Sequence, residues 1–293
     1  GDWSVLEGYQ IKVTQATTLP VVGSPVVPQN TPVPVAEGWQ IIPYLKNRPG
    51  DLEEELSSVN WAIIIVKDNE GRIYFPSLGI DQIGTLEPTQ GYWLKSTSQA
   101  YLYYSANFTG GGSGEASDRS NSHFDLGGLN TGNNATLILP SGIVLPAMLN
   151  AGDEIGVFSN GKLCGAGIFE EASLAIAIWG DDPQTPGNAE GALPGAPFSL
   201  RLWDAETSEE INLQLALENG SANYSPNEIY VASALESLLP NAATEDEPAF
   251  YFKYYPNPST GKVNFSLGVP SPAEIRFSMH SMDGKCVWQP ANR

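Results

Sequence analysis

Short apolar runs that alternate with polar residues recur along this chain, and glycine, proline and asparagine separate them. The pattern is most regular over residues 126–238, where the runs follow one another at intervals of about ten residues. Alternation with a period of two buries one face of a strand and leaves the other in water. We therefore predict a β-sandwich over this region. The alternating apolar positions are Leu174, Ile176 and Ile178, then Phe198, Leu200 and Leu202, then Ile211, Leu213, Leu215 and Leu217.

Residues 38–104 have the pattern of a smaller β-rich module with one short helix. An apolar strand begins at Trp39, and the run Trp61–Val66 is typical of a buried strand. Between them, Asp51 is the predicted N-cap of a short helix, because its side chain can accept a hydrogen bond from a free amide of the first turn. The turn Asn69-Glu70-Gly71 predicts a hairpin after the buried strand.

An internal repeat links this module to the start of the chain. The run Gly8-Tyr9-Gln10-Ile11-Lys12 is similar to Gly91-Tyr92-Trp93-Leu94-Lys95, which lies 83 residues further on, and Leu19 and Leu102 keep the same spacing. This period is longer than the roughly 20–50 residues of solenoid repeats. We therefore interpret residues 1–37 as the tail of a truncated copy of the module followed by a linker, with residues 38–104 as the complete copy.

Two further segments have the composition of linkers. Residues 105–125 are rich in glycine and serine, and residues 239–250 are acidic and contain proline. A last segment, residues 251–293, again alternates apolar and polar positions. The fold class that follows is mainly β, with tandem small β-sandwich or β-rich modules joined by linkers.

The charge of the chain limits its partners. The net charge is −19, and residues 125–240 hold 15 acidic residues against only Lys162 and Arg201. Nucleic acids and anionic membranes are bound through lysine and arginine, so neither is an expected partner. The sequence has no run of about 20 apolar residues, so no transmembrane span is expected either.

The acidic segment Gly180–Gly191 is the best candidate for a ligand site. It brings Asp181, Asp182 and Glu190 into one loop, and calcium prefers six to eight oxygen ligands on a flexible loop. These three residues are therefore the predicted calcium ligands, and no other cofactor is expected. The alternative is a solvated acidic turn in which Asp182 caps the chain before Pro183.

Catalytic residues are sparse in this sequence. Of the two histidines, His123 falls in the predicted linker and His280 in the last segment, so neither is expected to sit on a rigid scaffold beside a nucleophile. Cys164 and Cys286 do not have the spacing of metal ligands. We therefore expect a protein that is not an enzyme.

The last segment carries a motif with a known counterpart. Tyr255-Pro256-Asn257-Pro258-Ser259-Thr260-Gly261 is followed by an alternating strand and then by the turn Asp283-Gly284-Lys285. This arrangement resembles the N-terminal half of the C-terminal sorting domain of the type IX (Por) secretion system of Bacteroidota. The resemblance implies an Ig-like fold, export by the type IX secretion machinery and a secreted or outer-surface location. The motif residues are Tyr255, Pro256, Asn257, Pro258, Gly261, Asp283, Gly284 and Lys285.

Two main hypotheses of function follow. The first is a non-catalytic region of a secreted, cell-surface structural or adhesive protein, which binds surface partners or copies of itself. The alternative is a carbohydrate-binding or accessory region of a larger secreted hydrolase, and the candidates for stacking on sugars are Tyr92, Trp93, Tyr101, Tyr103 and Tyr104. Alternation puts Tyr101 and Tyr103 on one face of a strand and Leu102 and Tyr104 on the other, and one of these faces has to be core. A small secreted enzyme is the third and least favoured hypothesis.

Overall fold

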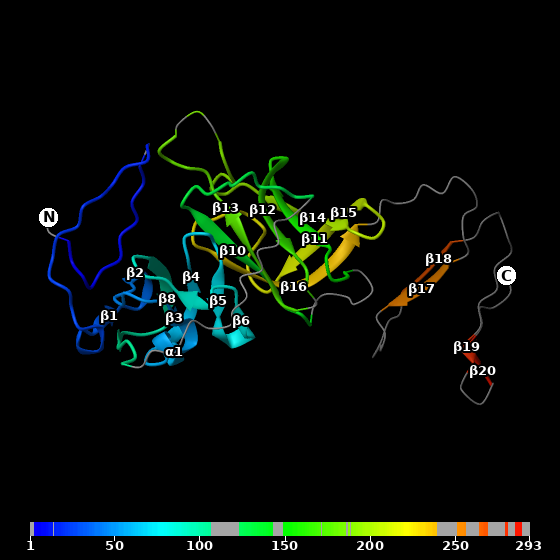
Figure 1. The fold of residues 1–293 in the computed structure, drawn as a ribbon. Helices are drawn as coiled ribbons and strands as arrows, with labels where there is room; N and C mark the ends of the chain where they lie inside the picture. The colour runs from blue at the N-terminus through cyan, green and yellow to red at the C-terminus, as the bar shows by residue number, and fades with distance from the viewer. Residues whose placement is uncertain are drawn as a thin grey trace. The chain divides into compact units, whose positions relative to one another are not determined.

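A computed structural model describes the following residues of the chain: 3–13, 15–106, 123–142, 149–170, 172–185, 187, 189–238, 251–255, 264–268, 279–280 and 285–288. The chain divides into two compact units, Gly1–Leu239 and Pro240–Arg293. The fold is mainly β, which confirms the prediction from the sequence (Figure 1). No helix in the described residues is long and apolar enough to span a membrane.

The first β-rich region of unit 1 is built on a five-stranded antiparallel sheet in the order β2-β8-β4-β5-β6. Two short strand pairs, β1 with β9 and β3 with β7, flank this sheet. The elements are β1 (Val33–Val35), β2 (Gly38–Pro43), β3 (Gly50–Asp51), α1 (Leu52–Leu56), β4 (Ile63–Lys67), β5 (Ile73–Phe75), β6 (Ile80–Asp81), β7 (Thr85–Leu86), β8 (Gly91–Ser96) and β9 (Ala100–Leu102).

The short helix α1 forms where the sequence predicts it. Its N-cap is Asp51, whose carboxylate accepts a hydrogen bond from the backbone N–H of Glu54 at 2.9 Å. Leu52 and Leu56 lie one turn apart and are both fully buried in the core of this region. The cap starts the helix, and the two leucines fix which of its faces packs inward.

The second β-rich region is one seven-stranded sheet in the order β12-β11-β14-β15-β16-β10-β13. Only the pair β10–β16 is parallel. Apolar residues from all seven strands fill its interior. The strands are β10 (Asn134–Leu139), β11 (Glu154–Ser159), β12 (Lys162–Ile168), β13 (Leu174–Trp179), β14 (Phe198–Asp204), β15 (Glu209–Leu217) and β16 (Ile229–Leu238).

This sheet curls until its two end strands, β12 and β13, lie next to each other, so it resembles a nearly closed barrel. Glycines on β12 allow the close approach. A Cβ atom at Gly165 would lie 2.5 Å from the carbonyl oxygen of Ala177 on β13, and one at Gly167 would lie 3.0 Å from the Ile176 side chain. Real side chains do not tolerate such contacts with backbone, so only glycine permits the curl at residue 165.

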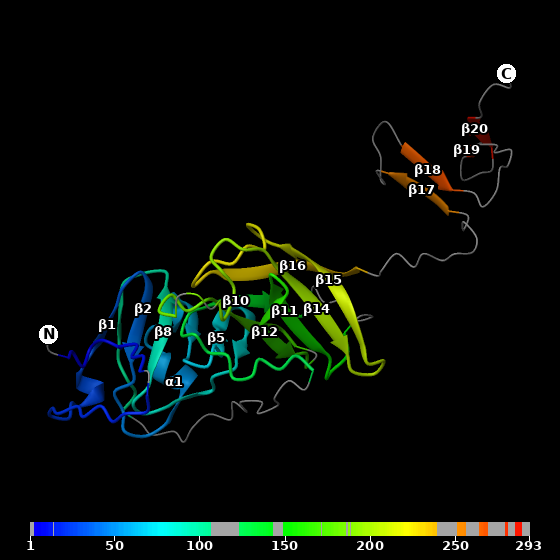
Figure 2. The same cartoon turned by 90° about the horizontal axis from the view of Figure 1, so that it is seen from above.

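The two β-rich regions pack against each other within unit 1. Strands β4, β5 and β6 lie beside the sheet that contains β10 and β13 (Figures 1 and 2). A buried apolar cluster joins them. The sequence patterns predict modules separated by a linker and do not predict this contact. Its members are Ile65, Ile73, Phe75 and Ile80 from the first region and Ile138 and Ala175 from the second. Most of the predicted linker, residues 107–122, lies outside the described residues.

Unit 2 contains two antiparallel strand pairs. Strand β17 (Tyr251–Tyr255) pairs with β18 (Asn264–Gly268), and β19 (Met279–His280) pairs with β20 (Cys286–Trp288). Strand β18 contains the alternating apolar residues Phe265 and Leu267.

Candidate functional site

The predicted calcium loop lies between β13 and β14. The carboxylate of Asp181 accepts a hydrogen bond from the backbone N–H of Glu190 at 2.9 Å, which closes the loop on itself. The Glu190 carboxylate accepts from the Thr185 hydroxyl at 2.8 Å and 2.9 Å, and this bond lowers the pKa of Glu190. Two of the three predicted ligands are therefore joined through the loop's own hydrogen bonds.

The third predicted ligand, Asp182, is buried and faces a lysine. One of its oxygens accepts from the backbone N–H of Gln184 at 3.0 Å, as expected of a turn-capping aspartate. The other oxygen forms an ion pair with Lys12, which lies far away in the sequence. Lys162 also reaches this loop and donates to the carbonyl oxygen of Ala189 at 2.5 Å.

Both lysines, Asp182 and Glu190 line an open depression of about 650 Å³. A calcium ion there would compete with two ammonium groups for carboxylates that already accept hydrogen bonds. Within the part of the chain that the structure describes, no three His, Cys, Asp or Glu side chains are grouped so that they could hold a metal ion. Calcium binding by Asp181, Asp182 and Glu190 stays a prediction.

Two other carboxylates, which begin the hairpin β11–β12, are buried and fully used by the protein. Asp153 accepts from the backbone N–H groups of Asn150 at 2.8 Å and Ala205 at 3.0 Å. Glu154 accepts from His123 N–H at 3.1 Å and Phe124 N–H at 2.9 Å. Part of the acidic character of this region thus serves to bind loop amides.

The position of His123 corrects the prediction that it belongs to a flexible linker. Its imidazole ring stacks on Trp203 with centroids 3.6 Å apart and an interplanar angle of 5°. Its Nε2 atom lies 2.8 Å from a carboxylate oxygen of Glu210, and its backbone is held by Glu154. This arrangement cannot be read from the sequence, because Glu154 and Glu210 lie 31 and 87 residues from His123.

The surroundings of His123 are charged and open to solvent. A carboxylate oxygen of Glu210 also lies 3.3 Å from a guanidinium nitrogen of Arg201. The hydrogen bond from His123 and, to a smaller extent, the one from Arg201 lower the pKa of Glu210. The guanidinium of Arg201 lies over the Phe158 ring at 4.2 Å. This chain of contacts holds His123 against β14 and β15. An imidazole–carboxylate pair can move a proton, but a nucleophile or a substrate site would be needed for catalysis.

Cys164 is the cysteine whose surroundings the structure describes, and its thiol has little reactivity. Cys164 is buried on β12, and burial raises its pKa to about 12. A thiol reacts as the thiolate, so Cys164 has little reactivity at neutral pH.

No family model matches this chain, and comparison with the curated proteins and with the solved structures found no match. The resemblance of residues 251–293 to a sorting domain therefore stays a prediction from the sequence. Tyr255 ends β17, and Lys285 is exposed just before β20. The other motif residues lie outside the described residues, namely Pro256, Asn257, Pro258, Gly261, Asp283 and Gly284.

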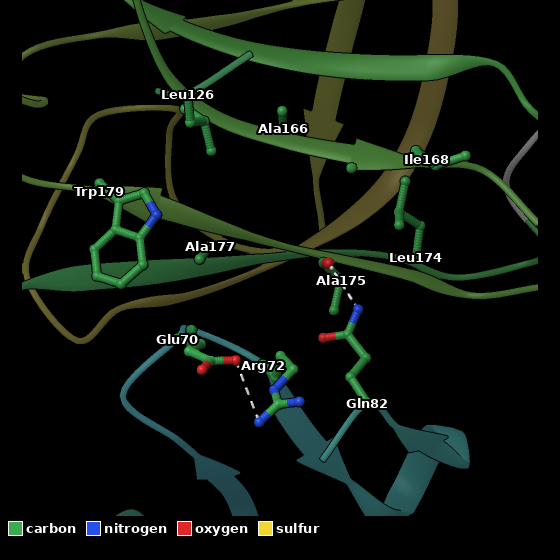
Figure 3. A pocket seen from close by; sticks show the side chains of 12 residues that line it. Glu70, Arg72, Gln82, Leu126, Ala166, Ile168, Leu174, Ala175, Ala177 and Trp179 are labelled. Atoms are coloured by element: carbon green, nitrogen blue, oxygen red, sulfur yellow. Dashed lines mark hydrogen bonds and ion pairs between the residues drawn. The ribbon is translucent and has the colours of Figure 1, made fainter. Parts of the chain in front are cut away.

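A small pocket of about 210 Å³ lies between the two β-rich regions (Figure 3). On one side Arg72 is 3.3 Å from Glu70, and Gln82 reaches across to donate to the carbonyl oxygen of Ala175 at 3.1 Å. On the other side Trp179 and other apolar side chains of β12 and β13 form the wall. Pockets for small molecules usually have about 300–1,000 Å³. This one is better described as part of the contact between the regions.

A buried lysine crosses the same contact. Lys67 ends β4, and its ammonium group donates to the backbone and side-chain oxygens of Asn134 at the start of β10, at 3.0 Å and 2.5 Å. The Trp39 ring lies 5.2 Å from the same nitrogen. Burial lowers the pKa of Lys67 to about 8. We call this lysine–asparagine pair, together with the apolar cluster around Ile65 and Ile138, the seam.

The side chains from Tyr101 to Tyr104, at the end of β9 and just after it, alternate between two faces as the sequence predicts. Leu102 and Tyr104 are buried in the core, whereas Tyr101 and Tyr103 are exposed. The Ser58 hydroxyl holds the backbone of Tyr103, with a distance of 3.0 Å to its nitrogen. Trp61, three residues after Ser58, is exposed as well. These three exposed rings come from two segments that are hydrogen-bonded to each other.

Proposed function

We propose that this chain is a non-catalytic region of a secreted cell-surface protein with a structural or adhesive role. In this role the two β-rich regions act as one rigid body that holds or displays other parts of the protein. The observation that carries the proposal is the seam. It joins regions that a glycine- and serine-rich segment alone would leave free to move.

The seam has the chemistry of a permanent contact. Its apolar members are buried, and its one cation is hydrogen-bonded to a fixed partner on the other region. A buried polar pair contributes little net stability, but it penalises every arrangement in which its partners do not meet. Such a pair favours a single orientation of the two β-rich regions relative to each other, which a structural or display role requires.

The route to the surface that we propose is type IX secretion, and it rests on the motif from Tyr255 to Lys285. The proposed partners are the secretion machinery and surface components or further copies of the protein. The net charge of −19 supports a partner other than nucleic acid.

The test uses beads coated with the full chain and measures their retention under flow on cell-surface preparations and on a layer of the same protein. We expect retention well above that of uncoated beads, and a loss of retention when Ile65→Ser and Ile138→Ser together disrupt the seam. An assay for hydrolysis of polysaccharides and peptides is run in parallel. Turnover that a single carboxylate substitution abolishes would contradict the proposal, as would retention equal to that of bare beads.

A carbohydrate-binding role is the second candidate, and the exposed rings of Trp61, Tyr101 and Tyr103 favour it. Sugar rings stack on exposed aromatic faces, so Tyr101→Ser and Tyr103→Ser should weaken binding in a titration against surface polysaccharides. Trp3→Ser is the control, because it removes an exposed ring from a different segment. Equal effects of all three substitutions would speak against a defined sugar site.

A further inference from the structure

The first residues of the chain have the same local structure as the residues 83 positions later. The backbone N–H of Ser4 donates to the hydroxyl of Tyr9 at 2.9 Å, and the backbone N–H of Glu87 donates to the hydroxyl of Tyr92 at 2.7 Å. The two donors, Ser4 and Glu87, are 83 residues apart, and so are the two acceptors, Tyr9 and Tyr92. The tyrosine therefore folds back onto its own lead-in turn in each copy.

The turn itself is also shared. The N–H of Glu7 donates to the carbonyl of Ser4 at 3.4 Å, and the N–H of Gln90 donates to the carbonyl of Glu87 at 3.3 Å. Two independent hydrogen bonds thus keep the spacing of the repeat, which the residue types alone only suggest. Residues 4–9 therefore have the local structure of residues 87–92, and the repeat spacing aligns residues 3–22 with residues 86–105.

The two copies differ in what covers their apolar side chains. Ile11 is 53 % exposed, but its counterpart Leu94 is 0 % exposed, and Leu19 is 51 % exposed against 0 % for Leu102. Every apolar side chain of this set is buried in the complete module and exposed at the start of the chain. The remaining pairs are Trp3 with Leu86, Tyr9 with Tyr92, and Val21 with Tyr104.

The complete module shows which strands provide the cover. Strand β8 lies between β2 and β4, and β9 pairs with β1. In contrast, the described residues between 3 and 27 belong to no strand. Their one backbone hydrogen bond to the five-stranded sheet that the structure describes runs from Gly8 N–H to the carbonyl of Ile41 at 3.1 Å. Residues 8–13 thus have the sequence of a central strand without its two neighbours.

We propose that residues 3–22 are a binding segment for the rest of a second module. The occupant is a stretch of polypeptide equivalent to residues 33–85, and its counterparts of β2 and β4 pair with the two edges of residues 8–13. A second copy of this chain does not fit, because its own β2 and β4 are already paired with β8. An anionic membrane does not fit a protein with a net charge of −19. The inference goes beyond the proposed function, and either can fail while the other holds.

The first test transplants the segment within the full chain. The residues from Gly91 to Tyr104 are replaced by the sequence of residues 8–21, which has the same length. We expect the chain to keep a single unfolding transition with a lower melting temperature, because the large apolar side chains all fall on buried positions. These side chains are Tyr9, Ile11, Val13, Leu19 and Val21. The control carries the sequence of residues 9–22 instead, and this slip by one residue turns every side chain to the opposite face.

The control should lose this cooperative unfolding transition. If both chimaeras fold, or if both unfold, the segment is not a counterpart of β8 and β9 and the proposal is wrong. This test needs no added partner, so it is informative even where the next one fails to produce a folded protein.

The second test supplies the occupant. A second copy of residues 33–85 is joined directly before Trp3 in the full chain, and amide hydrogen exchange is measured at Tyr9 and Ile11. We expect exchange to slow by about 100-fold or more, as for strands that open only with global unfolding. Ile11→Ser should abolish this protection. Val22→Ser should not, although Val22 is 96 % exposed, because its counterpart is the polar Ser105.

Unchanged exchange at both amides in the extended chain would overturn the proposal. It would also be overturned if the 293-residue chain formed a dimer in sedimentation experiments that Ile11→Ser disrupts. In that case the occupant would be a second copy of the same chain.

Discussion

The Lys67 ammonium group and the two oxygens of Asn134 meet between the β-rich regions, at 3.0 Å and 2.5 Å, although the residues belong to different sheets. Both residues are buried. A buried cation has to be hydrogen-bonded to remain charged, and a buried amide oxygen has to accept a hydrogen bond. Each residue therefore depends on the other, and the relative orientation of the two regions depends on both.

Replacement of this lysine should weaken the contact. Lys67→Met leaves the Asn134 side-chain oxygen without its donor, which should lower the free energy of unfolding by about 1–3 kcal/mol. The double variant Lys67→Met/Asn134→Leu should recover much of that loss, because both polar groups are then gone. Urea unfolding measures these values. Lys95→Met is the control, since Lys95 lies near the same Trp39 ring but is not buried. A loss as large in the control would contradict the prediction.

The lowered pKa of Lys67 predicts a dependence of stability on pH. In the folded state burial lowers the pKa to about 8, whereas the ordinary value is 10.5. Between these values the unfolded chain binds more protons, so stability should rise with pH. Below about pH 8 both states are charged and the penalty of burial is present in full.

The measurement is the difference in unfolding free energy between the natural chain and Lys67→Met at several values of pH. Buried tyrosines also titrate in alkali, and the difference between the two proteins removes their contribution. A difference that stays constant from pH 7.5 to about 9.5 would show that the lysine titrates as it does in water.

The buried Glu154 should be needed to hold the backbone of His123 and Phe124 in place. A glutamine at this position can accept with only one oxygen and places N–H groups against the amides of His123 and Phe124. Glu154→Gln should therefore lower stability by about 1–3 kcal/mol and speed amide exchange at Phe124. Glu236→Gln, a change at an exposed position on β16, is the matched control. Unaltered exchange at Phe124 would refute the anchoring role.

The curl of the seven-stranded sheet should depend on Gly165. In Gly165→Ala the new Cβ atom would lie 2.5 Å from the backbone oxygen of Ala177, and backbone cannot move aside as a side chain can. We expect a loss of about 1–3 kcal/mol in thermal unfolding. Gly142→Ala is the control, because a Cβ atom there meets nothing within 4 Å. Equal melting temperatures for both variants would mean that β12 and β13 separate without cost.

Calcium binding to Asp181, Asp182 and Glu190 can be tested through the lysine that opposes it. If the loop binds calcium, the ion has to displace Lys12 from Asp182, so Lys12→Ala should raise the calcium affinity. Isothermal titration of both proteins measures the change. Lys46→Ala, which removes a lysine from an ion pair in the other β-rich region, should have no effect. Absence of binding heat in both titrations would favour the solvated acidic turn.

Local features of this protein follow from its sequence because they depend on neighbouring residues. Alternation alone separates the buried Leu102 and Tyr104 from the exposed Tyr101 and Tyr103. The cap at Asp51 needs only an amide three residues away. The mainly β character, the position of the short helix and the repeat between Gly8 and Gly91 are determined at this level.

The contacts between distant segments were decided only by the tertiary structure. The side chains of Lys67, His123 and Lys12 bind Asn134, Glu210 and Asp182, which lie 67, 87 and 170 residues away. Many other acceptors and carboxylates in the chain have the same chemistry. Which of them is chosen depends on how two curved sheets fit together, and that fit is a property of many apolar side chains at once. Periodicity records which face of a strand is buried, but not what covers it.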